Sequence, residues 1–284
     1  MGRRFLGAMA ARHPAVRVRA LVHRTHLPAL DMVEPVDGRL DDEESLVPPL
    51  RGVDTVIHFA ASTHASKAER YFTTNTAGTA NLVRASQRAG VRRFILISTR
   101  AIRSECGDYA RSKAAAEAVV RTSGLPHVIL RFAEVYGGGS SEGLNALLDL
   151  VRKSPLVPCP VGGASLSPLW VDDAVDAVSR VVVRPDLPKD VYTIAGPRSY
   201  TLPQIIGIVA HRMAKRRLIV PIPLTLLPII ACLSTAIGGR RLRYDQISRL
   251  KCEKDSDIDD ARRDLEFTPL AFEEGVKRFL SEEC

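Results

Sequence analysis

The sequence predicts an α/β protein whose main domain is built around a doubly wound parallel sheet. Short apolar runs alternate with helix-like stretches through the first two-thirds of the chain, and polar, Gly or Pro residues bound each run. This strand–helix–strand rhythm is typical of parallel strands joined by helical crossovers. The 284 residues, 45% of them hydrophobic, can bury a sizeable core as one large domain or as two unequal ones.

Each expected element follows from a local pattern. The apolar runs predict strands over 16–22, 55–60, 93–98 and 127–132. Helices are expected over 75–89 and 109–122, the second closed by Gly124 with Pro126 beyond it. Because ligands bind at the carboxyl ends of parallel strands, the segments 59–62, 98–100 and 133–139 are candidates for the functional site.

Composition narrows the class of protein. The 40 Lys and Arg residues exceed the 32 Asp and Glu residues, but they are scattered, so we do not expect a nucleic-acid partner. The cysteines are odd in number and contain no C-x-x-C, which predicts a reducing compartment with neither a disulfide framework nor a metal site. They are Cys106, Cys159, Cys232, Cys252 and Cys284. No secretory leader opens the chain, so we expect a cytoplasmic protein.

Tyr109 and Lys113 form a Tyr-x-x-x-Lys pair at the start of the second expected helix. Residues four apart lie on one face of a helix. A free phenol loses its proton only near pH ~10, and an ammonium group held beside it favours the phenolate. The pair therefore predicts a side chain that can act as an acid or a base.

The pair is one of six motifs that occur in a characteristic order. Together they resemble the extended short-chain dehydrogenase/reductase superfamily, the NAD-dependent epimerase/dehydratase family, which has a Rossmann-like sheet. The motifs are His58-Phe59-Ala60-Ala61, the segment from Asn75 to Leu82, Ile97-Ser98-Thr99, Tyr109-x-x-x-Lys113, the segment from Leu130 to Gly137, and Val171-Asp172-Asp173.

The resemblance implies roles for the matching residues. Tyr109 would be the catalytic acid/base, and Lys113 would lower its pKa and hold the nicotinamide ribose. Thr99, with Ser98 beside it, would hydrogen-bond the substrate oxygen, and Asn75 would support the site from the neighbouring helix. Residues that would line the cofactor are Phe59, Ala60, Ala61 and Phe132.

The amino terminus departs from the family pattern. Gly2 resembles the last glycine of a G-x-x-G-x-x-G loop, so the first strand and most of the phosphate-binding loop are missing from this sequence. Either the sequence begins downstream of the natural start, or the natural chain has lost ordinary cofactor binding. The intact Tyr-Lys pair favours the first explanation. Residues 137–139, three glycines, predict a loop after a strand and not a phosphate cradle.

The end of the second strand predicts the cofactor. An acidic residue there binds the adenosine ribose of NAD, whereas a basic residue suits the 2′-phosphate of NADP. The sequence has Arg24 at this place and no carboxylate, with Arg3 and Arg4 as further basic residues. We therefore expect NADP or NAD, with NADP favoured.

Two positions differ from the family's sugar-nucleotide enzymes. Those enzymes carry an Asn after the sixth strand and an Arg before the Val-x-Asp motif, where this chain has Glu134 and Leu166. A carboxylate repels a diphosphate, and leucine cannot bond to one. A less anionic carbonyl, alcohol or sugar derivative is therefore the expected substrate.

The chain is expected to divide into a truncated NAD(P)-binding domain over 1–155 and a smaller, interleaved substrate domain over 156–284, with a homodimer expected from the family. Within the second part, 218–237 is uncharged and long enough to span a bilayer, and basic residues flank it. Its three prolines favour a turn and a short helix, so a buried or pocket-covering hairpin is preferred over membrane contact.

Two other functions stay open. The missing glycine loop is compatible with a non-catalytic dinucleotide-sensing or assembly subunit. The apolar segment with its basic flanks is compatible with a membrane-associated accessory factor or a site for a lipid-like substrate. Fold and acid/base residues are shared across many activities, so the substrate and the direction of the reaction are not predicted from this sequence.

Overall fold

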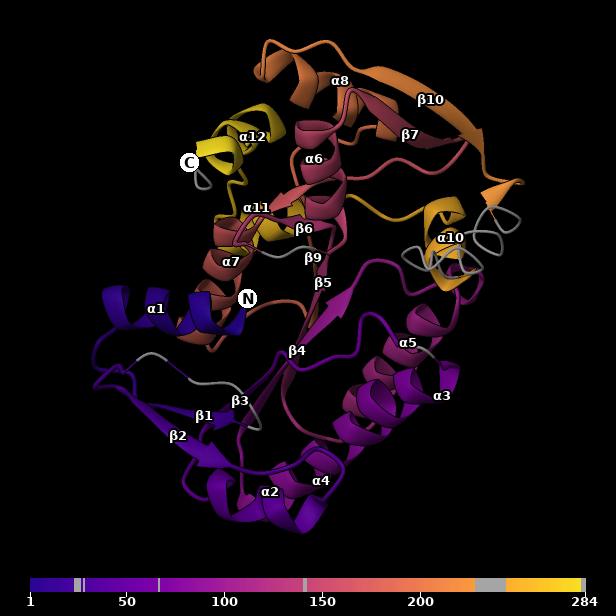
Figure 1. Cartoon of the computed structure of the whole chain (residues 1–284). Helices are drawn as coiled ribbons and strands as arrows, with labels where there is room; N and C mark the ends of the chain where they lie inside the picture. The colour runs from indigo at the N-terminus through magenta and orange to yellow at the C-terminus, as the bar shows by residue number, and fades with distance from the viewer. Residues whose placement is uncertain (23–26, 28, 66, 140–141, 228–243, 282–284) are drawn as a thin grey trace.

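The computed structural model describes the chain from residue 1 to 281, except for 23–26, 28, 66, 140–141 and 228–243. Its centre is a parallel sheet with strand order β3-β4-β5-β9 (Figure 1). These strands are β3 (Thr55–His58), β4 (Arg93–Thr99), β5 (His127–Phe132) and β9 (Val191–Ile194). A separate parallel pair is formed by β1 (Val18–Val22) and β2 (Val33–Asp37).

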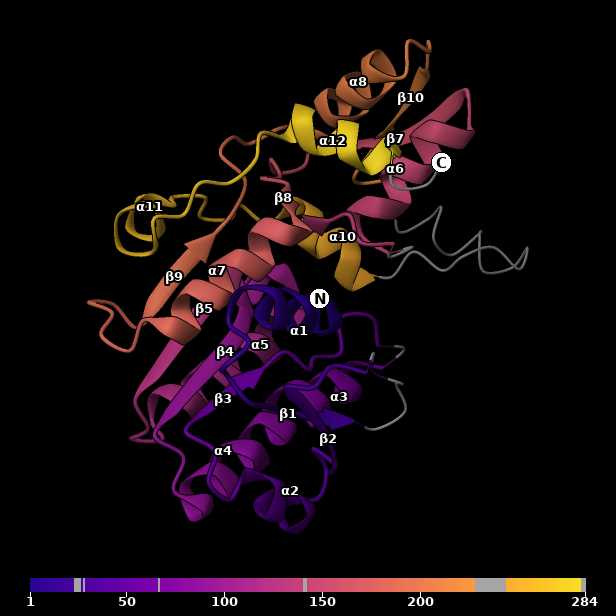
Figure 2. The ribbon, with the colours of Figure 1, turned by 90° about the vertical axis from the view of Figure 1, so that its left-hand side faces the viewer.

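Helices cover both faces of the four-stranded sheet. Figure 2 shows α1 (Gly2–Arg12) and α7 (Val171–Val183) side by side on one face. The other face carries α2 (Glu43–Leu50), α4 (Gly78–Ala89) and α5 (Asp108–Arg121). The predicted α/β class with a doubly wound parallel sheet is therefore confirmed.

The residues of β4 show how one strand supports two hydrophobic cores. Ile95 and Ile97 pack in a core with residues of α1 and α7. Phe94 and Leu96 pack in a second core with residues of α2, α4 and α5. Successive side chains of a strand point to opposite faces of the sheet. A strand that is buried on both faces therefore has a continuous run of apolar residues. This is why 93–98 is recognisable in the sequence.

A third core lies beyond the carboxyl ends of the strands. It joins β7 (Leu156–Val161), α6 (Leu144–Lys153), α8 (Leu202–Arg212) and α12 (Phe272–Ser281). Thr201 and Gln204 form a capping box at the start of α8. Three later elements, α7, β9 and α11 (Asp259–Leu265), pack with the four-stranded sheet and its core.

The remaining elements are short or irregular. The expected helix over 75–89 begins as a π-helical turn, η1 (Phe72–Ala77), before α4. The other elements are α3 (Ala68–Tyr71), η2 (Ser104–Cys106), β6 (Val135–Tyr136), β8 (Leu169–Trp170), β10 (Leu218–Pro223) and α10 (Tyr244–Lys251). Gly137, Gly138 and Gly139 follow β6 with positive φ and form a loop, as predicted.

The prediction for the start of the apolar segment is wrong. Residues Leu218–Pro223 form β10, a strand paired in parallel with β7, where a turn and a short helix were expected. Proline is tolerated in an edge strand, so it excludes the helix without excluding the strand. Residues 224–226 form a turn, as expected. Leu218 is 64% exposed, whereas Leu224 and Leu227 are buried, so only the start of the segment departs from a buried hairpin. Residues 228–237 lie outside the described part of the chain. No described helix is long and apolar enough to cross a membrane.

The expectation of no disulfide is also wrong. Cys106, in η2, and Cys252, just after α10, are joined by a disulfide, with their Cα atoms 5.3 Å apart. They are 146 residues apart in the sequence, so spacing alone gives no signal of the pairing. The bond depends on the packing of α10 against η2.

Candidate active site

Tyr109 lies in the first turn of α5, where the helix starts at the carboxyl ends of the strands. Its side chain is 9% exposed and packs with Ala65 and Tyr71. The Tyr71 ring meets it edge-on, with the two centroids 5.8 Å apart. The guanidinium carbon of Arg249, on α10, lies 4.8 Å from the centre of the Tyr109 ring. The phenol is therefore enclosed by an aromatic ring and a cation.

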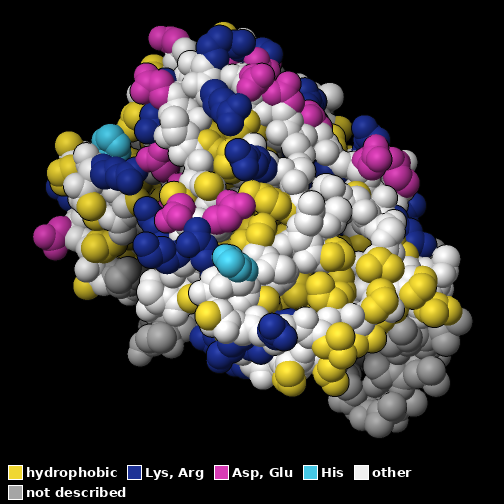
Figure 3. All heavy atoms as spheres, turned by 90° about the horizontal axis from the view of Figure 1, so that it is seen from above, with side chains coloured by type: hydrophobic (Ala, Val, Ile, Leu, Met, Phe, Trp, Pro, Cys, Tyr) yellow, Lys and Arg dark blue, Asp and Glu magenta, His cyan; other side chains and the backbone are white. Residues whose placement is uncertain are grey.

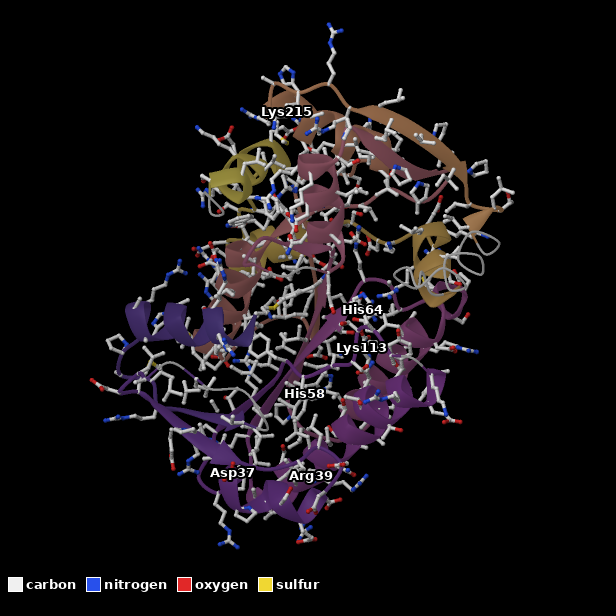
Figure 4. The ribbon with its side chains drawn as sticks, in the orientation of Figure 1. Asp37, Arg39, His58, His64, Lys113 and Lys215 are labelled. Atoms are coloured by element: carbon white, nitrogen blue, oxygen red, sulfur yellow. A yellow bond between two sulfur atoms is a disulfide. The ribbon has the colours of Figure 1, made fainter. Side chains whose placement is uncertain are left out.

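Lys113 lies one helical turn further along the same face of α5. It is 2% exposed, and its ammonium Nζ donates a hydrogen bond to the backbone oxygen of Ile97 at 2.7 Å. Burial lowers the pKa of Lys113 to about 8, although the nearby Glu117 carboxylate acts in the opposite direction. The buried His58, labelled with Lys113 in Figure 4, has its pKa lowered to about 3 by burial and by the charge of Lys113.

Asn75 joins the loop after β3 to α5. Its amide oxygen accepts from the backbone N–H of Ser62 at 2.7 Å. Its amide nitrogen donates to the backbone oxygen of Ser62 and to the hydroxyl of Ser112, the residue before Lys113. Asn75 itself sits in the π-helical turn, a distortion that recurs at functional sites. Asn75 therefore links the π-helical turn to the loop after β3 and to the start of α5.

Thr99 and Ser98 are successive residues at the end of β4, so their side chains point to opposite faces of the sheet and have different partners. The Thr99 hydroxyl oxygen accepts from the backbone N–H of Ala101 at 3.1 Å, which leaves its own O–H able to donate. Ser98 donates to a carboxylate oxygen of Glu117 at 2.6 Å. Glu117 also receives two hydrogen bonds from Arg131. Ser98 thus belongs to a buried network between β4, β5 and α5.

Glu134 lies between two buried cations. Its carboxylate pairs with Arg100 at 2.6 Å and with Lys254 at 3.0 Å. Burial alone would raise the pKa of Glu134, but the two cations outweigh it and hold the pKa at about 2. Two positive charges surround one negative charge, so the repulsion of a diphosphate expected from Glu134 does not follow. The cations are engaged by Glu134, and Arg100 also donates to the hydroxyl of Ser167.

Leu166 does not line the same place. It is 5% exposed and packs in the third core. Its backbone forms an isolated antiparallel bridge with Tyr200, with hydrogen bonds in both directions. The side chain is therefore part of the hydrophobic scaffold.

The start of α1 fits a phosphate group. Gly2 is the first residue of α1, no acidic residue lies in the first turn, and a Cβ added at Gly2 would meet no atom within 4 Å. Phe5 packs on Phe59 with ring centroids 5.3 Å apart, which holds this helix against the residues after β3. The N–H groups at the start of a helix attract anions. Together with Lys113, this edge of the sheet suits a dinucleotide.

The other expected cofactor residues differ in their surroundings. Ala60 is exposed and Ala61 is half-buried, so both are accessible after β3. Phe132 is 5% exposed and belongs to the core beneath α1 and α7. Arg24 lies outside the described residues. Arg4 pairs with Asp172 at 2.7 Å, which directs it towards α7.

A surface hollow of about 430 Å³ lies away from this site. Its lining includes Asp54, Arg92 and His127, at the amino ends of β3, β4 and β5. Tyr109, Lys113 and Thr99 lie at the carboxyl ends. Because parallel α/β sheets bind their ligands at the carboxyl ends, we place the active site there and not in the hollow.

Several residues of the site were not found from the sequence. Tyr71, Arg249 and Lys254 come from segments without a recognisable motif, and only the tertiary fold places them here. Arg100 gave a usable signal, since it follows Thr99 directly at the end of a predicted strand. A charged residue directly after a buried strand is a candidate for a buried ion pair, which Arg100 forms with Glu134.

Comparison with known proteins agrees with this geometry. Residues 1–149 match a family model described as NAD(P)H-binding. The chain belongs to the NAD(P)-binding extended short-chain dehydrogenase/reductase superfamily. A ceramide reductase of Caulobacter vibrioides is 32% identical over 224 residues, covering 77% of this chain and 69% of the relative. A UDP-glucose 4-epimerase of Vibrio cholerae is 27% identical over 205 residues, covering 62% of each chain.

A solved structure shows the same fold over the whole chain. MoeE5 in complex with UDP-glucuronic acid and NAD superposes with a TM-score of 0.79 at 21% identity, covering 100% of this chain and 96% of MoeE5. At this identity the likeness concerns the fold alone. The relatives of the extended short-chain superfamily found here are epimerases and reductases, which places this chain among NAD(P)-dependent enzymes.

Proposed function

We propose that this protein is an NAD(P)-dependent oxidoreductase or epimerase in which Tyr109 exchanges a proton with the substrate oxygen. A bound nicotinamide supplies or accepts the hydride at the adjacent carbon. The observation that carries the proposal is the position of Lys113. A fully buried ammonium group, one helical turn from an enclosed tyrosine, stabilises negative charge on the phenol oxygen as the proton leaves.

Thr99 completes the proton-transfer centre in this proposal. Its hydroxyl oxygen already accepts a backbone hydrogen bond, so its O–H is free to donate to the substrate oxygen. In the direction of reduction, the carbon gains the hydride while the oxygen gains the proton of Tyr109. Asn75 acts as a positioning residue because its bonds to Ser62 and Ser112 hold the start of α5. Ser98 has no part in this step.

The proposal also includes the choice of cofactor, the residues that hold it and the oligomeric state. NADP is favoured over NAD by Arg24, which follows β1 where the adenosine ribose binds in this type of sheet. The start of α1 is assigned to the pyrophosphate, with Phe59, Ala60 and Ala61 beside the cofactor. A homodimer is the assembly that we expect from the superfamily.

The proposed substrate is a carbonyl or hydroxyl compound less anionic than a nucleoside diphosphate sugar. Arg100 and Lys254 are two further buried cations near the strand ends, and both are engaged by Glu134. Leu166 supplies no charge. The ceramide reductase relative, whose name indicates an apolar substrate, supports the same choice. The UDP-glucose 4-epimerase relative makes UDP-glucose the comparison compound for a substrate assay.

The test compares Tyr109→Phe with Tyr200→Phe. The two tyrosines are similarly buried, 9% and 8% exposed, but Tyr200 lies in the third core and bonds to Glu273. Tyr109→Phe should lose at least about a hundredfold in turnover, followed by the absorbance of the reduced nicotinamide, and should still bind NADPH. Tyr200→Phe should keep its turnover.

Equal turnover in both variants would remove Tyr109 from the mechanism. NADPH binding by the wild type without turnover of any carbonyl or hydroxyl compound would favour a non-catalytic dinucleotide-sensing subunit. Faster turnover of UDP-glucose than of apolar ketones would contradict the proposed substrate class.

A further inference from the structure

The parallel pair of β7 and β10 has an apolar outer surface. The register pairs Leu156 with Leu218 and Pro158 with Val220, so these four side chains share one face. Leu156, Leu218 and Val220 are 52%, 64% and 42% exposed. We call these four residues the outer β7–β10 face. Figure 3 shows hydrophobic side chains gathered on this side of the molecule.

The opposite face of the same strands is a normal core surface. Val157 and Cys159 are fully buried, and Ile219 packs against the third core. Parallel strands are ordinarily covered on both faces, whereas a strand with one face in water ordinarily carries polar residues there. The outer β7–β10 face follows neither rule, since it is apolar and exposed in the described structure. A surface of this kind marks a binding site.

The edge of β10 cannot recruit another strand. Pro221 and Pro223 have no backbone N–H to donate, and Pro158 and Pro160 remove two further donors from β7. An added strand needs a row of free donors and acceptors. The partner must therefore contact the side chains of the face, and a broad apolar surface suits this better than an extended peptide.

Basic residues gather at one end of the face. Because the strands are parallel and in register, the segments before Leu156 and before Leu218 lie at the same end. They carry Lys153, Lys215 and Arg216, all exposed and without an ion pair among the described residues. Figure 4 shows Lys215 at the far end of the molecule from Lys113. The charge around the face is complementary to an anionic surface.

We propose that the outer β7–β10 face docks on the interface of an anionic phospholipid bilayer. Leu156, Leu218 and Val220 would insert among the headgroups, while Lys153, Lys215 and Arg216 would contact the lipid phosphates. Interfacial binding of this kind increases with the apolar area buried and with the number of basic residues at the surface. Residues 224–227, which follow β10 directly, are uncharged, so they add no charge that would oppose docking.

Vesicle flotation of the full chain tests the proposal without any measurement of turnover. The probes are vesicles of phosphatidylcholine and vesicles of equimolar phosphatidylcholine and phosphatidylglycerol. The wild type should float with the anionic vesicles and lose this binding at high salt. Lys215→Gln should weaken binding about fivefold on anionic vesicles. Lys67→Gln, which changes an exposed lysine of another surface, should have no effect.

The apolar part is tested with matched valines. Val220 is 42% exposed on the face, and Val183 is 43% exposed at the end of α7. Val220→Thr should weaken binding several-fold and Leu218→Gln about tenfold. Val183→Thr should bind like the wild type. Near-ultraviolet circular dichroism should show all of these variants folded.

Each other occupant of the face predicts a different result. If residues 228–243 covered it, Leu218→Gln would lower stability without changing flotation. If a second copy of the chain covered it, Leu218→Gln would change the sedimentation of the lipid-free protein. Either of these two results would overturn the proposal. So would equal effects of Val220→Thr and Val183→Thr, or the failure of the wild type to float with anionic vesicles. None of these results depends on the role of Tyr109, so docking and catalysis can fail separately.

Discussion

The guanidinium of Arg249 stacks over the ring of Tyr109, with its carbon 4.8 Å from the ring centre. The two residues are far apart in the sequence, and the contact joins α10 to the first turn of α5. Arg249 also donates to the backbone oxygen of Thr63 at 3.4 Å, so it lies across the loop after β3. A cation over an aromatic face is attracted to it and stabilises negative charge that develops nearby.

Arg249→Gln should therefore lower kcat/KM about threefold to tenfold. The acid limb of the pH profile should move to higher pH, because the variant stabilises the phenolate less. Steady-state kinetics across pH would measure this, with Arg212→Gln on α8 as the control variant. A loss of kcat/KM with an unmoved pH profile would show that Arg249 only positions α10.

Lys113 makes the pH dependence of stability predictable. Burial lowers its pKa to about 8, from an ordinary value of 10.5. Between these two pH values the unfolded chain binds a proton that the folded chain has released, so stability rises with pH. Relative to Lys113→Met, the wild type should gain on the order of 3 kcal/mol between pH 8 and pH 10.5. Below pH 8 the buried charge lowers stability.

Urea unfolding of both proteins at several pH values would measure this gain. Lys67→Met, at an exposed lysine, should run parallel to the wild type over the whole range. A constant difference between the wild type and Lys113→Met would mean that Lys113 keeps an ordinary pKa in the folded protein. The same variant should lose turnover, because the charge beside Tyr109 is absent.

The site shows which features a sequence can predict. Tyr109 and Lys113 lie on one helix, so their spacing alone predicts that they share a face. The different directions of Ser98 and Thr99 follow from strand alternation, which predicts that the two hydroxyls have different partners. Lys254 and Arg249 reach the site from segments far along the chain. Their positions depend on how α10 and its flanking loop pack, which no local pattern encodes.

The strands also differ in how far the local sequence predicts them. The residues 93–98 and 127–132 were recognisable because they are buried on both faces of the sheet. The start of β10 was misread, since a proline-containing apolar run suggests an interrupted helix as readily as an edge strand. The pairing of β10 with β7, which joins residues about 60 positions apart, decides between these two structures.

Glu134 should be essential for stability. Arg100 and Lys254 have side chains only 1% and 4% exposed, and Glu134 is their shared counter-ion. Glu134→Gln leaves two buried cations without compensation, so the free energy of unfolding should fall by about 3 kcal/mol. Glu266→Gln, at a carboxylate 69% exposed, should cost less than about 1 kcal/mol.

The pH dependence gives a second check on Glu134. The folded-state pKa of Glu134 is held at about 2, below its ordinary value of 4.5. Its contribution is therefore present above pH 4.5 and is lost as the pH falls towards 2. The difference in stability between the wild type and Glu134→Gln should shrink over this range. A difference that stays the same at low pH would contradict the ion-pair account.

The Cys106–Cys252 disulfide should stabilise the folded chain. It closes a loop of 146 residues and ties the turn before Tyr109 to the end of α10. Closing a loop of this length reduces the entropy of the unfolded chain, which predicts a gain of about 5 kcal/mol. Reductant should lower the urea midpoint of the wild type by a corresponding amount. Peptide mapping without reduction should recover the two cysteines in one linked peptide.

Cys252→Ser and Cys159→Ser provide the matched comparison. Cys252→Ser should unfold like the reduced wild type, and reductant should not change it. Cys159 is a free, buried thiol in β7, so Cys159→Ser should keep the full response to reductant. Because the disulfide also anchors the helix that carries Arg249, reduction should loosen the cover over Tyr109 and lower kcat/KM in the wild type. Unchanged stability and unchanged kcat/KM in reductant would show that the bond does not form in solution.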